Sequence, residues 1–485
     1  MTNASKTPSV ATQGTRRWKL STRLCALSRM ALLGAVAFGL TALAPAVAAP
    51  SIYPTGVTRY EPARAYNSYV LFGDVTAKGH PISYLIDMDG HVVHTWPYAA
   101  SPTKMIDPAR IGGKKGVIGA DVSHLSRKGV GLIPGMPLVY ENKEIGLVDW
   151  DGKVIWRGGS DGPGGGLHQH HDWARLPNGK MLVLGTWVHK IPAFGNRVMY
   201  DPVIYEVNRR GKIDWRWIAS KHMNELGFTK RQLQMIYHTS VFDFFHMNDM
   251  EPLGPNHWAA AGDKRFAPEN IMISSRNANF TAIIDRKSGH IVWEIGPNYA
   301  HSNGLFSYNK VPGPITQISG QHDSHMIPEG LPGAGDVLVF DNQGEAGYPP
   351  AALKPTSGSR VLEINPVTKK VVWEYSGHNS NMPSWDFFSP LFGSAQRLPN
   401  GNTLIDEGTD GRIFQVTPDG AIVWEYVSPY ITGAHYTKKR QLILGNLVYR
   451  AEAVPYNWVP AGTAHSQKSI KALIPANFHV SGAGK

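Results

Sequence analysis

The 485-residue chain has little cysteine and little charge. Its single cysteine, Cys25, excludes a disulfide framework and any metal site built from several thiolates. Charged residues make up 18% of the chain and hydrophobic residues 42%, which excludes a disordered polyelectrolyte. No apolar run reaches the roughly 20 residues that a membrane-spanning helix needs. The chain also lacks a GxxxxGK loop followed by Ser or Thr, so no nucleotide donor is indicated.

The formal net charge of +11 suggests a nucleic-acid partner until it is located along the chain. Residues 1–48 carry six basic side chains and no acidic one, which leaves +5 for the remainder. A globular protein with so mild an excess is not expected to bind nucleic acid. The six basic residues are Lys6, Arg16, Arg17, Lys19, Arg23 and Arg29.

The first 48 residues have the organisation of a cleavable export signal. A basic segment precedes the apolar run 31–44, and the small residues Ala46 and Ala48 follow at the spacing of a cleavage site. Arg16 and Arg17 favour a twin-arginine signal, with a Sec-type signal or an uncleaved anchor as alternatives. We therefore expect a periplasmic or secreted protein without a stable membrane span after cleavage.

One hairpin motif recurs six times along the chain. Each copy has an apolar strand, a polar turn, a short second strand and a tryptophan, and successive copies lie 51 to 80 residues apart. Glycine or Asp-Gly in most of the turns provides the positive φ angles that tight hairpins need. The six tryptophans are Trp96, Trp156, Trp215, Trp293, Trp373 and Trp424.

A second hairpin precedes the first in several repeats, most clearly at 175–184 and 397–405. Two hairpins make a four-stranded antiparallel unit, and six units predict an all-β, six-bladed β-propeller. Each blade can bury its tryptophan only against the next blade, so the ring must close. We expect the stretch 441–450 to complete a blade. Two stacked β-sandwiches would leave the sixfold hairpin unexplained.

These patterns divide the chain into four segments. The predicted segments are an export signal (1–48), a short linker (49–67), the propeller (68–459) and a C-terminal tail (460–485).

Three successive blades carry a histidine six residues before the proline of their first-strand turn. The pairs are His171 and Pro177, His246 and Pro252, and His322 and Pro328. The next blade has Gly393 at this position. Because the first strand of a blade lines the central channel, we expect the three imidazoles to meet at the channel mouth. Arg276 ends the second strand of the His246 blade and should lie beside His246.

Imidazoles and a guanidinium, with no carboxylate pair at that register, suit an oxyanion. Arginine presents a planar fork of donors that matches sulfate or phosphate oxygens. Histidine can act as a neutral nucleophile, as an acid or base, and as a covalent carrier of a transferred group.

The segments around these residues resemble the bacterial arylsulfate sulfotransferases. The resemblance rests on His170-His171-Asp172, His246-Met247-Asn248, Arg276 and Gln321-His322-Asp323, beside the tryptophan hairpins. It implies a six-bladed propeller that moves a sulfuryl group from an aryl sulfate to a phenol through a sulfated histidine, with no cofactor and no metal.

The resemblance also implies roles for individual residues. His322 matches the nucleophile, His246 and Arg276 match groups that bind the sulfuryl oxygens, and His171 matches the remaining histidine. Either His171 or His246 would take the proton of the phenol. The substrate-binding candidates are Asn248, His170, Tyr348 and Phe388. The oligomeric state stays open, a homodimer being one option.

Three other readings remain open at this point. Residues 285–293 are similar to the repeat of quinone-dependent propeller oxidoreductases. The three histidines could instead ligate a metal ion. A non-catalytic propeller that binds a partner is the last alternative, and it predicts no charged cluster at the channel mouth.

Overall fold

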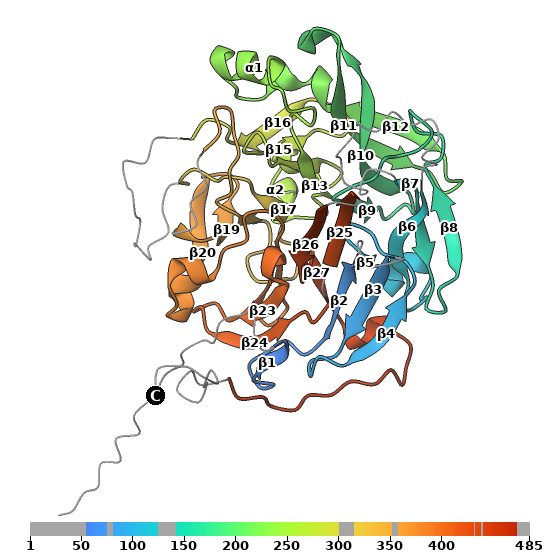
Figure 1. The fold of residues 1–485 in the computed structure, drawn as a ribbon, viewed down its shortest axis with the longest axis vertical. Helices are drawn as coiled ribbons and strands as arrows, with labels where there is room; N and C mark the ends of the chain where they lie inside the picture. Colours follow the sequence, from blue (N-terminus) through green and yellow to red (C-terminus); the bar gives the residue numbers. More distant parts are fainter. Residues whose placement is uncertain are drawn as a thin grey trace, which may run out of the picture. The chain divides into compact units, whose positions relative to one another are not determined.

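A computed structural model describes residues 55–74, 81–124, 142–299, 315–351, 357–430, 432–437 and 440–472. Six antiparallel sheets, five of four strands and one of five, surround a common centre (Figure 1). The predicted all-β, six-bladed propeller is therefore confirmed. The proposed export signal lies outside the described residues.

Each blade runs from an inner strand to an outer strand, and neighbouring inner strands contact one another around most of the ring. Blade 1 contains β27 (Ala451–Val454), β2 (Tyr69–Asp74), β3 (Ile82–Ile86) and β4 (Val92–Trp96). Blade 2 contains β5 (Lys104–Met105), β6 (Ile118–His124), β7 (Asn142–Val148) and β8 (Val154–Gly158). Blade 3 contains β9 (Trp173–Arg175), β10 (Met181–Ile191), β11 (Arg197–Val207) and β12 (Ile213–Ile218).

The remaining three blades follow the same order. Blade 4 contains β13 (Met247–Pro252), β14 (Ile271–Ser275), β15 (Phe280–Ile284) and β16 (Ile291–Ile295). Blade 5 contains β17 (His322–Met326), β18 (Val337–Asp341), β19 (Arg360–Asn365) and β20 (Lys370–Tyr375). Blade 6 contains β21 (Ser394–Arg397), β22 (Thr403–Glu407), β23 (Arg412–Val416) and β24 (Ile422–Val427).

Both ends of the described chain close the ring. The C-terminal strand β27 pairs with β2, and the N-terminal strand β1 (Gly56–Tyr60) pairs with β24 as a fifth strand of blade 6. Two boundaries therefore differ from the sequence prediction. The closing strand is not 441–450, and the predicted linker contributes a strand to a blade.

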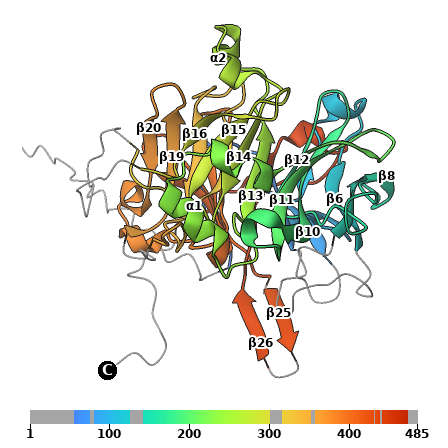
Figure 2. The ribbon, with the colours of Figure 1, turned by 90° about the horizontal axis from the view of Figure 1, so that it is seen from above.

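The stretch expected to close the ring belongs to another hairpin. The strand β26 (Arg440–Gly445) pairs with the preceding β25 (Thr432–Thr437). Figure 2 shows this hairpin projecting from the propeller. A strand this close in sequence to its partner pairs locally, and the next segment is left to pair with β2.

The hairpin tryptophans join each blade to the next. Five of them donate their indole N–H to a backbone carbonyl of the following blade, at 2.7 to 3.0 Å. The bond from Trp424 to Met88 joins blade 6 to blade 1 and so closes the circle. In blade 3 this role falls to Trp217, which donates to Gly289 at 2.9 Å. The predicted Trp215 is more exposed and lies 3.7 Å from the Arg286 guanidinium.

The described part of the C-terminal tail contacts β1, the strand that extends blade 6. The backbone of Ile470 exchanges both of its hydrogen bonds with Tyr60 of β1.

Two short helices lie in the connections around β13, namely α1 (Lys230–Tyr237) and α2 (His257–Ala260). Among the described residues no helix is long and apolar enough to span a membrane.

Candidate active site

The three predicted histidines lie where inner strands of consecutive blades begin. His171 precedes β9 by two residues, His246 directly precedes β13, and His322 is the first residue of β17. The φ angles of His171 and His246 are 60° and 45°. Such left-handed backbone costs of order 1–3 kcal/mol in a non-glycine residue and persists only where the surroundings enforce it. The fold thus holds both imidazoles in set positions.

Blade 6 shows why the histidine series stops. Gly393 has a φ of 139° at the equivalent position, and a Cβ atom there would lie 2.5 Å from a ring carbon of Phe340. No side chain fits at this point of blade 6.

His171 and His246 lie edge to face. Their ring centroids are 4.6 Å apart, with 77° between the ring planes. Behind His171, Nδ1 of His170 lies 2.5 Å from Nδ1 of His171, and Nε2 of His170 lies 2.8 Å from the Thr186 hydroxyl. Burial lowers the pKa of His170 to about 3. Burial, together with His246 and His170, also lowers the pKa of His171 well below its usual value. His170 therefore supports His171 as a neutral ring.

The side chain of Asn342 sets the tautomer of His322. Nδ1 of His322 lies 2.8 Å from Oδ1 of Asn342 and 3.1 Å from the Gly320 carbonyl. The amide nitrogen of Asn342 donates to the carbonyls of Ser389 and Phe392, so the amide oxygen faces the imidazole. Two acceptors at Nδ1 place the proton there and leave the lone pair on Nε2.

The imidazole of His322 is neutral at physiological pH. Burial lowers its pKa to about 3, and the charge of Arg276 and the ring of His246 act in the same direction. The bond to Asn342 opposes this shift but is outweighed. A neutral ring with a free Nε2 is the form in which histidine is a nucleophile.

His246 has a carboxylate partner. Its Nδ1 lies 2.6 Å from Oδ2 of Asp243, and its backbone N–H donates to Oδ1 of the same side chain at 3.0 Å. A carboxylate at Nδ1 orients an imidazole and stabilises its protonated form. His246 is thus better suited than His171 to accept a proton.

Arg276 lies beside His246, one residue beyond the end of β14. Its backbone N–H donates to the carbonyl of His246 at 3.1 Å, and its Nη1 donates to Asn277 at 3.0 Å. The Nε atom is buried, with no hydrogen-bond partner among the described residues. Burial lowers the pKa of Arg276 and Asp243 opposes this, but an arginine stays charged. The buried N–H is a donor available to an anion.

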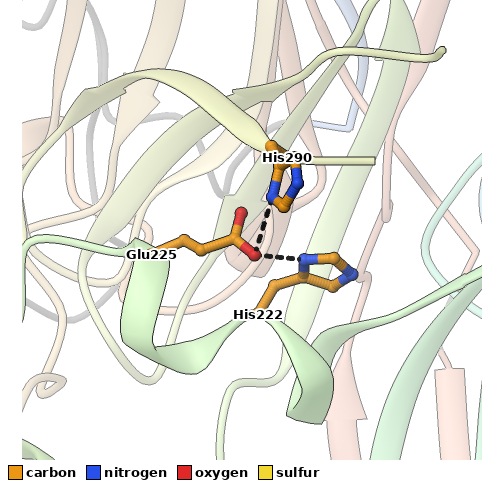
Figure 3. A group of neighbouring side chains, drawn as sticks. All are labelled: His222, Glu225 and His290. Carbon is orange, nitrogen blue, oxygen red and sulfur yellow. Dashed lines mark hydrogen bonds and ion pairs between the residues drawn. The ribbon is translucent and has the colours of Figure 1, made fainter. Parts of the chain in front are cut away.

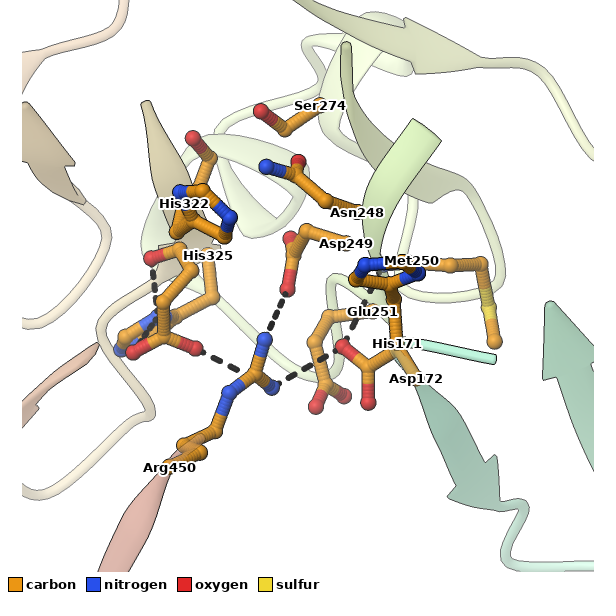
Figure 4. A network of polar contacts seen from close by, with 12 residues as sticks. His171, Asp172, Asn248, Asp249, Met250, Glu251, Ser274, His322, His325 and Arg450 are labelled. Carbon is orange, nitrogen blue, oxygen red and sulfur yellow. Dashed lines mark hydrogen bonds and ion pairs between the residues drawn. The ribbon is translucent and has the colours of Figure 1, made fainter. Parts of the chain in front are cut away.

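Beneath the histidines, one arginine joins the same three blades (Figure 4). Nη1 of Arg450 lies 3.0 Å from Asp172 and 3.2 Å from Asp323, and Nη2 lies 3.2 Å from Asp249. Arg450 directly precedes β27, the strand that closes the ring. The sequence analysis, which found no carboxylate pair at this register, was wrong on this point. Each of these aspartates follows a channel histidine by one or three residues.

The buried carboxyl groups in and around this network differ in their pKa. Burial would raise the pKa of Asp172, but Arg450 and Lys104 hold it well below its usual range. Burial and the charge of Asp172 raise the pKa of Asp249. Arg450 lowers this pKa, but by less than the other two effects raise it. Lys104 of β5 lies 2.7 Å from Asp172. Burial also raises the pKa of Glu452, in β27, to about 7.

The remaining predicted substrate-binding residues occupy different places. The Asn248 amide donates to the Gln321 carbonyl at 2.6 Å, while its Oδ1 is buried without a partner among the described residues. Tyr348 donates its hydroxyl to the Phe244 carbonyl at 2.7 Å and packs against the core between blades 3 and 4. Phe388 is half-buried between β20 and β21. Asn248 follows His246 by two residues in the chain, and Figure 4 shows its side chain near His322.

Two aromatic residues near the histidines escaped the sequence analysis. The Tyr449 ring lies 5.5 Å from the His171 ring, and its hydroxyl donates to the His171 carbonyl at 3.1 Å. The Phe392 ring lies 6.4 Å from the His322 ring and 5.7 Å from the Tyr449 ring. A signal existed for both residues. Tyr449 lies within the stretch 441–450 expected to complete a blade, and Phe392 precedes Gly393 of the histidine register.

The fold and these side chains define a class: a six-bladed propeller whose channel carries imidazoles, a guanidinium and a buried charge network. The arylsulfotransferase (ASST) family model matches residues 141–429, more than half of the 485-residue chain. The chain belongs to the arylsulfotransferase family. Membership supports an arylsulfotransferase activity in broad terms, and aryl sulfates and phenols are substrates that fit the family.

Similarity to other known proteins is low. No curated protein matches the chain. A protein of unknown function from Bacteroides caccae is 12% identical over 74% of this chain and 93% of its own, with a TM-score of 0.40. The periplasmic gluconolactonase of Pseudomonas aeruginosa is 10% identical over 80% and 99%, with a TM-score of 0.37. Virginiamycin B lyase from Staphylococcus aureus is 10% identical over 80% and 98%, with a TM-score of 0.35.

Proposed function

We propose that the protein transfers a sulfuryl group from an aryl sulfate to a phenol in two steps, with His322 as the carrier. The observation that supports this most is the tautomer of His322. Its Nδ1 is engaged by Asn342 and Gly320, so the Nε2 lone pair remains for attack on sulfur.

In the first step, Nε2 of His322 attacks the sulfur atom of the aryl sulfate. An N–S bond forms, the S–O bond to the ring breaks, and the aryl oxide leaves with the electron pair. Negative charge on the sulfuryl oxygens is stabilised by Arg276, whose buried Nε has no partner among the described residues. His171, held neutral by its buried surroundings, contributes a further N–H donor to these oxygens.

In the second step, a phenol attacks the same sulfur atom and the N–S bond breaks, which restores His322. The phenol must lose its proton as it attacks, since its pKa is near 10. His246 accepts this proton because Asp243 stabilises the resulting imidazolium. In the first step the same residue protonates poor leaving groups, as microscopic reversibility requires.

The rings of Phe392 and Tyr449 provide aromatic surfaces for the aryl groups. Asn248 contributes its Oδ1, which has no partner in the described part of the chain and can accept a hydrogen bond from the hydroxyl of the phenol. We also propose that the protein acts in the periplasm or outside the cell, on the strength of its signal-like first 48 residues.

Intact-mass measurement after addition of 4-nitrophenyl sulfate alone tests this function. The wild-type protein should gain the mass of one sulfuryl group and lose it when phenol is added. His322→Ala should gain nothing, whereas the matched control His325→Gln, in the same strand, should behave as wild type. Release of nitrophenol by His322→Ala at the wild-type rate would reject the assignment.

A further inference from the structure

A second cluster of ligating side chains lies at the joint between blades 3 and 4 (Figure 3). Nδ1 of His222 lies 2.8 Å, and Nδ1 of His290 3.1 Å, from Oε1 of Glu225. The three ligating atoms lie within 4.8 Å of one another. Among the described residues this is the one group of three or more His, Cys, Asp or Glu gathered so closely, and the channel histidines are not part of it.

The cluster draws on two blades. His222 and Glu225 belong to the segment after β12 of blade 3, where Glu225 ends the 3₁₀ helix η5 (Met223–Glu225). Residues three apart eclipse in such a helix, so both side chains face the same way. His290 comes from the turn between β15 and β16 of blade 4.

The surroundings hold the cluster in place before any ligand binds. The backbone N–H of Ile291 donates to Oε2 of Glu225 at 2.9 Å, which directs Oε1 toward the two imidazoles. The ring of His222 stacks on Trp217, the tryptophan that joins blade 3 to blade 4.

We propose that His222, Glu225 and His290 bind one zinc ion, which clamps blade 3 to blade 4. Two histidines and one glutamate form a known zinc ligand set with a fourth position open to solvent. At Zn–ligand distances of about 2.0–2.2 Å, tetrahedral ligands lie roughly 3.3 Å apart. The distances of 2.8 and 3.1 Å from Oε1 of Glu225 to the two imidazoles therefore need only a small expansion, and the two imidazole nitrogens already lie within 4.8 Å of each other. His290 is 67% exposed, which leaves the site accessible.

The neighbouring surface accommodates the fourth ligand. A hollow of about 230 Å³ beside His222 is lined by Lys221 and Lys287 among other residues. Basic side chains there favour an anion such as hydroxide or chloride on the metal. The site is separate from the channel histidines, so the inference does not depend on the proposed function.

Calorimetric titration of chelator-treated, full-length protein with zinc chloride at pH 7.5 tests the proposal. The wild type should bind one zinc per chain at the site, and His290→Gln and Glu225→Gln should each weaken this binding at least about tenfold, since even outer partners of metal ligands matter that much. The control His238→Gln, which removes an exposed histidine of α1's C-terminus, should bind as wild type. Zinc should also raise the melting temperature of the wild type and not that of His290→Gln.

Two outcomes would overturn the proposal. One is the absence of saturable zinc binding up to 100-fold excess. The other is zinc binding that survives in both cluster variants and disappears in His171→Gln, since that ion would belong to the channel.

Discussion

The transfer of the sulfuryl group from donor to enzyme should keep its rate when the pH falls from 8 to 5. A histidine with the ordinary pKa of about 6.5 is only about 3% neutral at pH 5, so a nucleophile of that kind would lose roughly thirtyfold in rate. With its pKa lowered to about 3, His322 stays about 99% neutral at pH 5. A lowered pKa thus keeps the nucleophile in its reactive form under mildly acidic conditions.

Stopped-flow release of nitrophenol from 4-nitrophenyl sulfate, in the absence of acceptor, isolates this step. Nitrophenolate leaves without a proton, so this step needs no general acid. Near-UV circular dichroism at each pH checks that the protein is folded. A decline of about thirtyfold that follows a single pKa near 6.5 would refute the argument that burial keeps His322 neutral.

The Asn342→Leu variant tests the tautomer of His322 separately from its pKa. It leaves the Nδ1–H of His322 with only the Gly320 carbonyl, at 3.1 Å. Loss of one partner of a buried hydrogen bond costs about 1–3 kcal/mol, which corresponds to a rate about 5- to 150-fold lower while the pH profile stays flat. Asn270→Leu is the control. Asn270 is equally buried, but it lies at the end of blade 4 that is opposite to His246. Equal losses in both variants would indicate a general effect on stability.

Two further predictions concern the two arginines. Arg276→Ala should lower the rate of sulfation about 10²–10³-fold, because one donor to the sulfuryl oxygens is lost; a loss below about threefold in the same stopped-flow assay would show that Arg276 only packs. Arg450→Met should cost about 3–5 kcal/mol of unfolding free energy at pH 8, because it leaves buried carboxylates without their cation. Urea unfolding should show a smaller cost at pH 5, because burial raises the pKa of Asp249 and a protonated carboxyl group needs no cation; an equal cost at both pH values would contradict this account.

Much of the fold could be predicted because its signals are local. Strands, turns and tryptophans recur along the chain, and each hairpin forms from residues close in sequence. The differences between prediction and structure arose at contacts between blades. Trp215 and Trp217 lie on the same face of β12, and only the position of Gly289 in blade 4 decides that Trp217 docks there.

The candidate site also has a part that the sequence predicts and a part that it does not. The register of His171, His246 and His322 is visible in the sequence, because inner strands of equivalent blades begin at equivalent positions. The partners that give these rings their chemistry are not visible. Asp243 lies in an irregular segment before β13, so no repeat aligns it. Asn342 directly follows β18 as Arg276 directly follows β14, but this repeated position does not reveal that the amide oxygen faces His322.

By itself, then, the sequence determined that six hairpin units build a ring and that three blades turn a histidine toward its centre. Only the tertiary structure decided which charges lie under those histidines. Arg450 meets Asp172 across 278 residues of chain, and that meeting depends on β27 pairing with β2 to close the ring. Contacts made by closure carry no local pattern, because neither residue's neighbours in sequence encode the partner.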